Sequence, residues 1–464
     1  MLKIFKQYYP IRNIFFFVGE SFFIVLSILL ATWVTWDFSF DSLRETDLPK
    51  VVLVGLILQI CLYYNDLYEF KTGINFKDLG LRLLEALGET AILLALIFFL
   101  FPEAIMEDGV LGLSAVILLG VVISWRYIYM LALDRGFFNQ LIIIMGSGEL
   151  AQNIVKEIQD NKDCGYSISL IMYEEGDQNV WVDFKTLAPI VNASKDLNEK
   201  AKTAGVKKVI VALGEKRGRM PIRELLQCRL DGLEVIDGNT FIERLTGKLI
   251  VKNLNPGWLI FSDGFQKSPV QDILKGTVDI FFALVLLALL SPLMAVVAVL
   301  IKLDSKGPIL FTQQRAGKGR HLYRIFKFRS MVQDAEGATG PVWAGESDAR
   351  ITRVGKMLRR FRIDELPQIW NVLKGDMSFV GPRPEREVFI KELVKQVPYY
   401  DARLTVKPGI TGWAQINYSY GASVEDAVEK LNYDLFYIKN MSFLMDVLII
   451  LRTIKIVLFG TGAR

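Results

Sequence analysis

The chain has 464 residues, 52% of them hydrophobic, and its mean hydropathy is positive at +0.32. This length leaves room for two or three domains, and the composition predicts membrane segments beside soluble parts. Lys and Arg number 54 against 50 Asp and Glu, and His321 is the single histidine. A Ser-His-Asp catalytic site and a multi-histidine metal site are therefore disfavoured. The three cysteines are scattered without C-x-x-C spacing, which is typical of reduced thiols.

Four apolar runs fill the first part of the chain, at 15–36, 51–64, 84–101 and 110–133. Most are long enough to cross a bilayer core of about 30 Å, although the second is short. The N-terminal segment is basic, and the loops "DFSFDSLRETD" and "FPEAIMEDG" are acidic. The positive-inside rule then puts the N-terminus and everything after Asp134 in the cytoplasm. We expect a four-helix transmembrane domain over 1–135, retained as an anchor and not removed as a signal peptide.

A fifth apolar run, 276–302, has the pair Ser291-Pro292 near its middle. Proline inside a helix removes a hydrogen bond and kinks the helix, and each arm alone is too short to span a bilayer. Basic residues flank both ends, Lys275 on one side and Lys302 on the other, which favours both ends on one side of the membrane. A re-entrant hairpin satisfies both conditions, and a kinked spanning helix is the alternative.

The middle of the chain alternates strand and helix patterns, which predicts a Rossmann-like α/β domain over 139–238. Gly146 and Gly148 form a candidate nucleotide turn between the strand "LIIIM" and a helix, and Glu174-Glu175 follows near the position of a ribose-binding acid. The same glycines also serve as a tight structural turn, and we favour a structural or regulatory domain without a catalytic nucleotide. Residues 239–270 are expected to form a linker or β segment.

The segment "RRFRIDELPQIWNVLKG" carries two adjacent carboxylates, Asp364 and Glu365, at the start of a predicted helix that Gly375 ends. Asp364 falls at the N-cap position and Glu365 in the first turn. Two readings are open for Asp364: a capping aspartate, or the group that performs the chemistry. The apolar positions recur on one helical face: Leu366, Ile369, Trp370 and Leu373.

The surroundings of these carboxylates are basic, because residues 302–362 hold about fourteen Lys and Arg against five Asp and Glu. Such a segment suits an anionic partner, and nucleic acid, a phospholipid surface and a sugar nucleotide are all compatible with charge alone. We expect the helix N-terminus and the neighbouring arginines to favour the ionised form of both carboxylates. An ionised carboxylate in a phosphate-binding region can attack phosphorus or hold Mg²⁺.

Two further stretches add cations to this region. In "FKFRSM", Lys327 and Arg329 alternate around Phe328 as on a strand with one basic face. In "SFVGPRPE", a Gly-Pro-Arg-Pro turn presents Arg383, and arginine can bind a phosphate through two hydrogen bonds. These stretches make Lys327, Arg329 and Arg383 candidates for binding the phosphates of a substrate.

Five motifs in order, "SP" in the fifth apolar run, "FKFRSM", "RIDELPQ", "LKGDMSFVGPRP" and "KPGITGWAQIN", resemble the bacterial sugar transferase family. The likeness is to monotopic polyprenyl-phosphate glycosyl-1-phosphate transferases in their large form, similar to undecaprenyl-phosphate glucose or galactose phosphotransferases. It implies an integral membrane α+β protein with a four-helix transmembrane bundle and a Rossmann-like α/β cytosolic domain. A monotopic catalytic domain, 271–464, would follow, with a re-entrant helix at 276–302 broken at Ser291 and Pro292.

The resemblance also implies a reaction. Asp364 matches a nucleophile that attacks the β-phosphate of a UDP-sugar and releases UMP, and Glu365 matches the ligand of Mg²⁺. Lys327 and Arg359 match phosphate-binding positions, and Arg383 matches an arginine near the nucleotide. Polyprenyl phosphate then takes the sugar phosphate, as the first membrane step of exopolysaccharide, capsule or O-antigen synthesis. The implied location is the bacterial inner membrane with a cytoplasmic catalytic domain, with membrane lipid and no nucleic acid as partner, and homo-oligomerisation stays open.

Three rival functions are weighed against this one. An inverting glycosyltransferase usually holds its metal with D-x-D, and no two aspartates in this chain stand two apart. A polytopic phosphosugar transferase would need about ten spans, against at most five apolar runs here. A non-catalytic membrane scaffold or nucleotide sensor of a polysaccharide assembly complex is the remaining alternative. The sequence does not predict which sugar is transferred.

Overall fold

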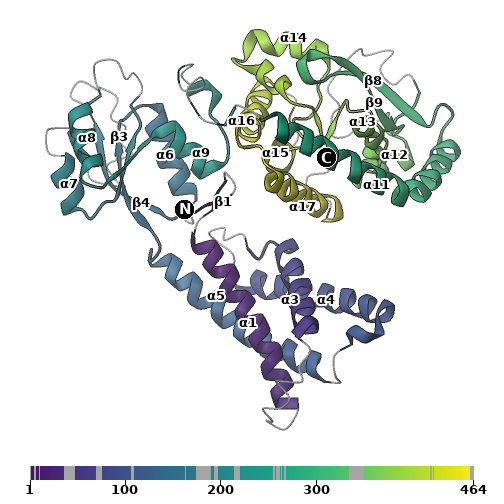
Figure 1. Cartoon of the computed structure of the whole chain (residues 1–464), viewed down its shortest axis with the longest axis horizontal. Helices are drawn as coiled ribbons and strands as arrows, with labels where there is room; N and C mark the ends of the chain where they lie inside the picture. Colours follow the sequence, from purple (N-terminus) through teal and green to yellow (C-terminus); the bar gives the residue numbers. More distant parts are fainter. Residues whose placement is uncertain are drawn as a thin grey trace. The chain divides into compact units, whose positions relative to one another are not determined.

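The computed structural model divides the chain into an N-terminal unit, Tyr8–Phe241 with Met1–Ile4, and a C-terminal unit, Ile242–Arg464 with Phe5–Gln7 (Figure 1). Each unit is described by itself. The structure describes residues 2–4, 7–9, 11–35, 48–68, 76–105, 109–161, 164–173, 190–192, 197–213, 220–253, 257, 262, 264–265, 268–333, 350–418, 421 and 423–459.

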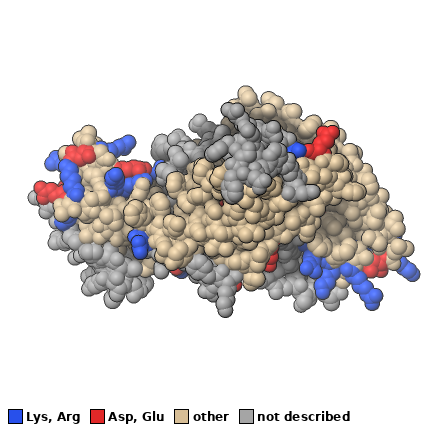
Figure 2. Space-filling model, turned by 90° about the horizontal axis from the view of Figure 1, so that it is seen from below, with Lys and Arg blue, Asp and Glu red and all other residues tan. Residues whose placement is uncertain are grey.

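Four apolar helices occupy the first part of the N-terminal unit, as predicted: α1 (Ile11–Thr35), α3 (Leu48–Tyr64), α4 (Phe76–Leu100) and α5 (Val110–Asp134). By length and composition α1, α4 and α5 could each cross a membrane, whereas α3 is shorter. Between α1 and α5 the Glu20 carboxylate is 2.6 Å from Arg126 Nη2, and both side chains are buried. In the space-filling view of Figure 2, much of the visible surface of the described residues is tan, the colour of residues other than Lys, Arg, Asp and Glu. The predicted acidic loop 37–47 lies outside the described residues, whereas the loop 101–109 is described except at 106–108 and contains a 3-10 turn, Pro102–Ala104.

A five-stranded parallel sheet forms the second part of this unit, which confirms an α/β domain. The strands lie in the order β5-β4-β3-β6-β7, with helices α6, α7 and α8 between them in sequence. Their bounds are β3 Gln140–Met145, α6 Glu149–Asp160, β4 Tyr166–Tyr173, β5 Ile190–Asn192, α7 Leu197–Thr203, β6 Lys208–Val211, α8 Ile222–Leu230 and β7 Glu234–Asp237. Two short strands, β1 (Leu2–Ile4) and β2 (Gln7–Tyr9), pair near the N-terminus.

The predicted glycine turn lies between β3 and α6, and Gly146 has a structural reason to be glycine. Its φ is +131°, and a Cβ there would lie 2.3 Å from the carbonyl oxygen of Ala212. Glycine is therefore required by close backbone approach, whether or not a nucleotide binds. Gly148 precedes α6 with open space around it. The acidic pair Glu174-Glu175 lies outside the described residues. The prediction of a structural or regulatory domain without a catalytic nucleotide therefore stays a prediction.

In its described residues the C-terminal unit is mainly helical, with two small sheets (Figure 1). Strands β8 and β9 are antiparallel, and β10 and β11 are parallel. Its elements are α9 Gly238–Thr246 at the unit boundary, α11 Pro269–Asp304, β8 Leu310–Ala316, β9 Leu322–Phe328, α12 Arg353–Arg360, α13 Ile369–Leu373, β10 Ser378–Val380, α14 Glu387–Gln396, β11 Gly409–Thr411, α15 Trp413–Asn417, α16 Val424–Asn440 and α17 Phe443–Phe459.

The segment 242–253 is part of this unit's core. Leu249 and Val251 are 1% and 2% exposed within its largest hydrophobic cluster, and the Trp413 indole N–H donates to the carbonyl of Gly247 at 2.8 Å. The described residues of the predicted linker or β segment, 239–270, contain most of α9, a 3-10 turn at Val251–Asn253 and the first two residues of α11, and no strand. The core of the C-terminal unit therefore begins before the predicted boundary at residue 271.

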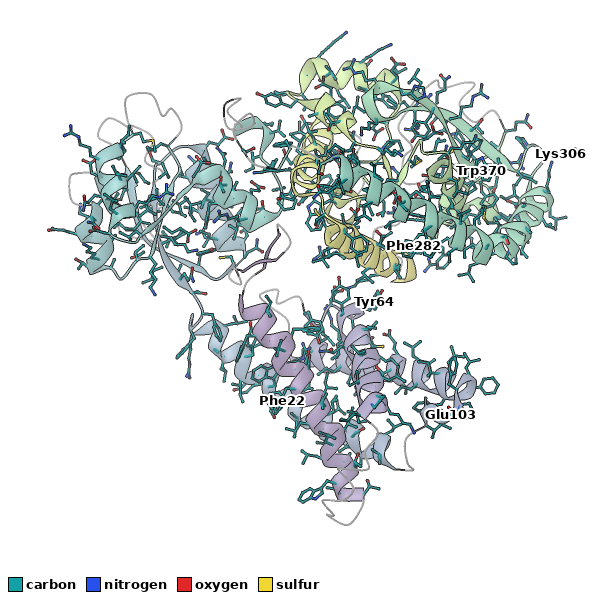
Figure 3. The ribbon with its side chains drawn as sticks, viewed as in Figure 1. Phe22, Tyr64, Glu103, Phe282, Lys306 and Trp370 are labelled. Carbon is teal, nitrogen blue, oxygen red and sulfur yellow. The ribbon has the colours of Figure 1, made fainter. Side chains whose placement is uncertain are left out.

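Helix α11 is one continuous helix with Pro292 inside it, so the predicted break at Ser291 and Pro292 does not divide it in two. The Ser291 hydroxyl donates to the carbonyl of Ala288 at 3.0 Å, within the same helix. One face of α11 lies in two hydrophobic clusters of the C-terminal unit, which contain Ala283 and Ile301 respectively. The other face is exposed and apolar, as at Phe282 (Figure 3).

Candidate active site

The chain enters the site through a turn that the sequence pattern did not predict. Helix α12 starts at a regular N-cap, where the Thr352 hydroxyl accepts from the Gly355 amide at 3.0 Å. After α12, Arg362 adopts a left-handed conformation with φ +53°, and residues Ile363–Gln368 form a 3-10 turn ahead of α13. The position before this turn is Arg362, so Asp364 lies inside the turn and caps no helix. The capping interpretation of Asp364 is therefore wrong.

The same turn changes which side chains are buried. Ile369 and Val372 are 3% and 1% exposed, whereas Trp370, predicted on the apolar face, is 49% exposed (Figure 3). A 3-10 turn has about three residues per turn and an α-helix has 3.6, so the turn rotates the following positions relative to an all-α register. The prediction that Gly375 ends the helix is confirmed by its φ of +80°.

Glu365 is a buried carboxylate with two cationic partners. Its Oε1 lies 2.7 Å from Lys327 Nζ, on β9, and 2.9 Å from Arg383 Nη2, in the turn after β10. Burial works against ionisation of Glu365, but Lys327 and Arg383 outweigh it and hold the pKa of this carboxyl well below its ordinary range. Glu365 is therefore a fixed negative charge.

Asp364 is equally buried, at 9% exposure, but has a different environment. Within the described part of the chain, no hydrogen bond or ion pair of its carboxylate is found. Burial raises the pKa of Asp364, and the Glu365 charge adds to this effect against the opposing influence of Lys327 and Arg359. The expectation that the surroundings favour ionisation of both carboxylates thus holds for Glu365 and is wrong for Asp364, because desolvation is the larger influence there. A desolvated carboxylate without hydrogen bonds is a stronger nucleophile once ionised.

Asn371, which the sequence analysis missed, joins the helix of the site to the strand. It is fully buried; its Oδ1 accepts from the Phe326 amide at 3.0 Å, and its Nδ2 donates to the Arg324 carbonyl at 2.7 Å. These bonds fix α13 against β9 next to Lys327. A polar residue one position after Trp370 in an apolar segment was the signal available in the sequence.

Arg329 does not belong to the site. It is 6% exposed, and its guanidinium donates to the carbonyls of Ser305 at 2.7 Å and Lys306 at 2.9 Å, where α11 ends. Arginine there satisfies carbonyl groups that a helix C-terminus leaves without partners. These contacts occupy its guanidinium at the end of α11 and argue against phosphate binding by Arg329, which stays a prediction.

Arg359 lies near the carboxylates, at the C-terminal end of α12. Its Nε donates to the Ser330 hydroxyl at 2.9 Å, and its charge lowers the pKa of Asp364. The structure thus brings together Lys327, Arg359, Asp364, Glu365 and Arg383, five of the six residues predicted for catalysis or phosphate binding.

The carboxylate pair also fits the hypothesis of a magnesium site. Among the described residues there is no group of three or more His, Cys, Asp or Glu side chains that could hold a metal ion. Mg²⁺, however, commonly uses one or two carboxylates and takes its other ligands from substrate phosphates and water. Asp364 and Glu365 are two adjacent oxygen donors of this kind.

Sequence comparisons agree with this arrangement. The model of the family described as "Bacterial sugar transferase" matches residues 270–460, which include every residue of the site. An Escherichia coli (strain K12) protein described as a UDP-glucose:undecaprenyl-phosphate glucose-1-phosphate transferase is 30% identical over 329 residues, 69% of this chain and 68% of that protein. The chain belongs to the bacterial sugar transferase family.

Two other relatives match shorter parts of this bacterial sugar transferase. An Aeromonas hydrophila UDP-N-acetylgalactosamine-undecaprenyl-phosphate N-acetylgalactosaminephosphotransferase is 45% identical over 242 residues, 52% of this chain. The chain spans about half of that relative's length, 56%. An exopolysaccharide production protein of Rhizobium leguminosarum bv. phaseoli is 42% identical over 190 residues, 39% of this chain and 94% of that protein. A second family model, described as a CoA-binding domain, matches residues 64–227.

Proposed function

We propose that this bacterial sugar transferase moves a sugar 1-phosphate from a UDP-sugar to polyprenyl phosphate through a covalent intermediate on Asp364. The observation that carries the proposal is the difference between two adjacent carboxylates, one bound by two cations and one buried without a hydrogen bond among the described residues. Carboxylates pushed in opposite directions by their surroundings commonly have different roles in one reaction. The names of the relatives supply the substrate class and the role in polysaccharide synthesis.

The reaction has two displacements at one phosphorus atom. A carboxylate oxygen of Asp364 forms a bond to the β-phosphorus of the UDP-sugar, the bond to the bridging oxygen breaks, and UMP leaves with that oxygen and the electron pair. A phosphate oxygen of polyprenyl phosphate then attacks the same phosphorus and releases the Asp364 carboxylate. The product is a polyprenyl diphosphosugar, and no oxidant or reductant is consumed.

The cations of the site would act on the phosphates. Arg383 and Lys327 are positioned to bind phosphate oxygens near Glu365, and Arg359 approaches Asp364 from α12. In such transfers most of the catalysis comes from positioning and from stabilisation of developing negative charge. Glu365 is the residue that would hold Mg²⁺, whose charge would offset the negative charge of the substrate phosphates.

The contacts of α11 support a helix that enters and leaves the membrane on one side. Near its start, Lys275 lies 2.5 Å from Asp446 of α17, and near its end the Asp304 carboxylate accepts from the Val354 amide of α12 at 3.1 Å. Both ends therefore bond to the same unit, and the helix face between them is packed on it. If the two ends of α11 lay on opposite sides of the membrane, the unit that both ends contact would have to lie on both sides as well. Because nucleotide sugars are cytoplasmic, we infer that this unit faces the cytoplasm, at the bacterial inner membrane.

The test is to trap the intermediate. Purified protein incubated with a UDP-sugar labelled in the sugar and without lipid acceptor should retain label on the protein and release UMP. Asp364→Asn should retain none, whereas Asp401→Asn, a change at an exposed aspartate, should behave as the unmodified protein. Label retained by Asp364→Asn, or turnover without any trapped adduct, would contradict the proposal.

A further inference from the structure

The turn that carries Arg383 is bonded from outside at four successive carbonyl oxygens. The acceptor and donor pairs are Pro382 O with Gly409 N (2.9 Å), Arg383 O with Arg403 Nη2 (3.0 Å), Pro384 O with Arg315 Nη1 (3.2 Å) and Glu385 O with Ala316 N (3.1 Å). Pro382 and Pro384 have no amide N–H, so the turn cannot form a regular ladder of its own. Its conformation therefore depends on the groups that surround it.

Two of these donors are arginine side chains from distant parts of the chain. Arg315 lies on β8, and its guanidinium also donates to the Gln313 side chain at 2.6 Å. Arg403 is 6% exposed and donates to the Tyr400 hydroxyl at 2.6 Å, and its Nη2 lies 2.9 Å from Asp434 Oδ2 on α16. A buried guanidinium needs a charged partner and several acceptors to offset its desolvation, and Asp434, Tyr400 and the turn supply them.

The backbone contacts of Arg383 have a direct consequence for its side chain. The Arg383 guanidinium reaches Glu365 at 2.9 Å, on a long side chain with much rotational freedom. Its position is determined only if the backbone at its base is fixed. Arg403 bonds the Arg383 carbonyl itself, and Arg315 bonds the carbonyl of the next residue.

We propose that Arg403 and Arg315 are positioning residues for Arg383, which hold the Gly-Pro-Arg-Pro turn so that the Arg383 guanidinium stays at Glu365 and at the substrate phosphate. In this role both arginines act on the backbone of the turn and not on the substrate. The inference rests on the proposed function, because it assigns the two arginines to phosphate binding by Arg383. Lysine cannot replace arginine here, since one ammonium group lacks the planar fork that bonds the turn and a second acceptor together.

A double-mutant cycle on UMP release from a UDP-sugar tests this inference. Arg403→Lys should lower kcat/KM by about 10- to 100-fold, the range typical of residues that orient a functional group. Arg383→Gln should lower it at least as much. The double variant should be no worse than Arg383→Gln alone, because positioning has no value once the positioned group is absent. Losses that multiply, or an Arg403→Lys protein with unchanged kcat/KM, would overturn the inference.

Controls separate positioning from general destabilisation. Lys439 on α16 forms a similarly buried ion pair, with Glu243 at 2.7 Å, so Lys439→Gln should lower the melting temperature but leave kcat/KM unchanged. An equal loss of kcat/KM in Lys439→Gln would overturn the inference.

If Arg403→Lys does not fold, Arg315→Lys, at a side chain with 20% exposure, takes its place in the cycle with the same expected result. A wild-type protein that releases no UMP would overturn the proposed function itself, whereas an active wild type with an additive cycle would overturn only this inference.

Discussion

Lys327 Nζ lies 2.7 Å from Glu365 Oε1, and this ion pair distinguishes Glu365 from its neighbour in sequence, Asp364. Lys327 and Arg383 together keep Glu365 ionised. Asp364 is similarly buried, but its carboxylate has no ion pair among the described residues. The consequence is a pair of adjacent, similarly buried acids for which the same chemical change should have opposite effects on stability.

Asp364→Asn should leave the protein at least as stable as the wild type at neutral pH. The substitution removes a buried negative charge and no helix cap, so we expect the free energy of unfolding to rise by about 1 kcal/mol, as is common when a functional site is neutralised. Thermal unfolding in one detergent, with wild type alongside, measures this. A clear fall in melting temperature would show that the carboxylate has a stabilising partner.

Glu365→Gln should lower the free energy of unfolding by about 3 kcal/mol, because it leaves Lys327 and Arg383 without their charge partner. The folded-state pKa of Glu365 is depressed, so its stabilising contribution is present above the unfolded pKa of about 4.3 and is lost as pH falls through the folded pKa. The stability difference between wild type and Glu365→Gln should therefore be constant near neutral pH and shrink below about pH 4. A difference that does not change with pH would contradict this.

Formation of the adduct should fall on the acid side at a higher pH than an ordinary aspartate would give. The nucleophile must be ionised, and burial raises the pKa of Asp364 above its usual value of about 4. The pH dependence of kcat/KM for UMP release measures this, with thermal unfolding at each pH as the control for acid denaturation. A rate that stays flat down to about pH 4 would be inconsistent with this assignment.

Lys327→Met and Arg329→Met should have different effects on catalysis and stability, although the two positions are only two residues apart. Lys327→Met should lower kcat/KM for the UDP-sugar by about 100-fold, since it removes a cation from the site. Arg329→Met should leave KM nearly unchanged and lower the melting temperature, because Arg329 bonds the carbonyl groups at the end of α11. A raised KM in Arg329→Met with an unchanged melting temperature would restore the phosphate-binding role.

Truncation should show where the C-terminal unit begins. A protein of residues 238–464 keeps Leu249 and Val251 in the core and the bond from Trp413 to Gly247, whereas 269–464 loses all three. We expect the longer protein to unfold cooperatively and to release UMP, and the shorter one to have a markedly lower melting temperature. Equal melting temperatures would mean that segment 242–253 contributes nothing to the fold.

Local patterns predicted the elements well. The four N-terminal apolar helices, the α/β domain with its parallel sheet, the strand that carries Lys327 and the helix end at Gly375 were all read from periodicity and turn residues. These features depend on residues close together in the chain, so the sequence is sufficient to predict them. The acidic pair was predicted from a helix start, Lys327 from a strand pattern and Arg383 from a Gly-Pro-Arg-Pro turn, while Arg359 came from the family resemblance.

The tertiary structure alone decided the role of each charge. Lys327 and Arg329 share one short motif, yet Lys327 pairs with Glu365 from within β9, whereas Arg329 follows the last residue of β9 and donates to carbonyl groups where α11 ends. Asp364 is a cap by local pattern, but the left-handed Arg362 and the 3-10 turn place it inside a buried site. Arg403 acts on Arg383 across twenty residues through a backbone carbonyl, a contact without any local signature. Burial and long-range partners set the pKa of a side chain, and both arise only when distant segments pack together.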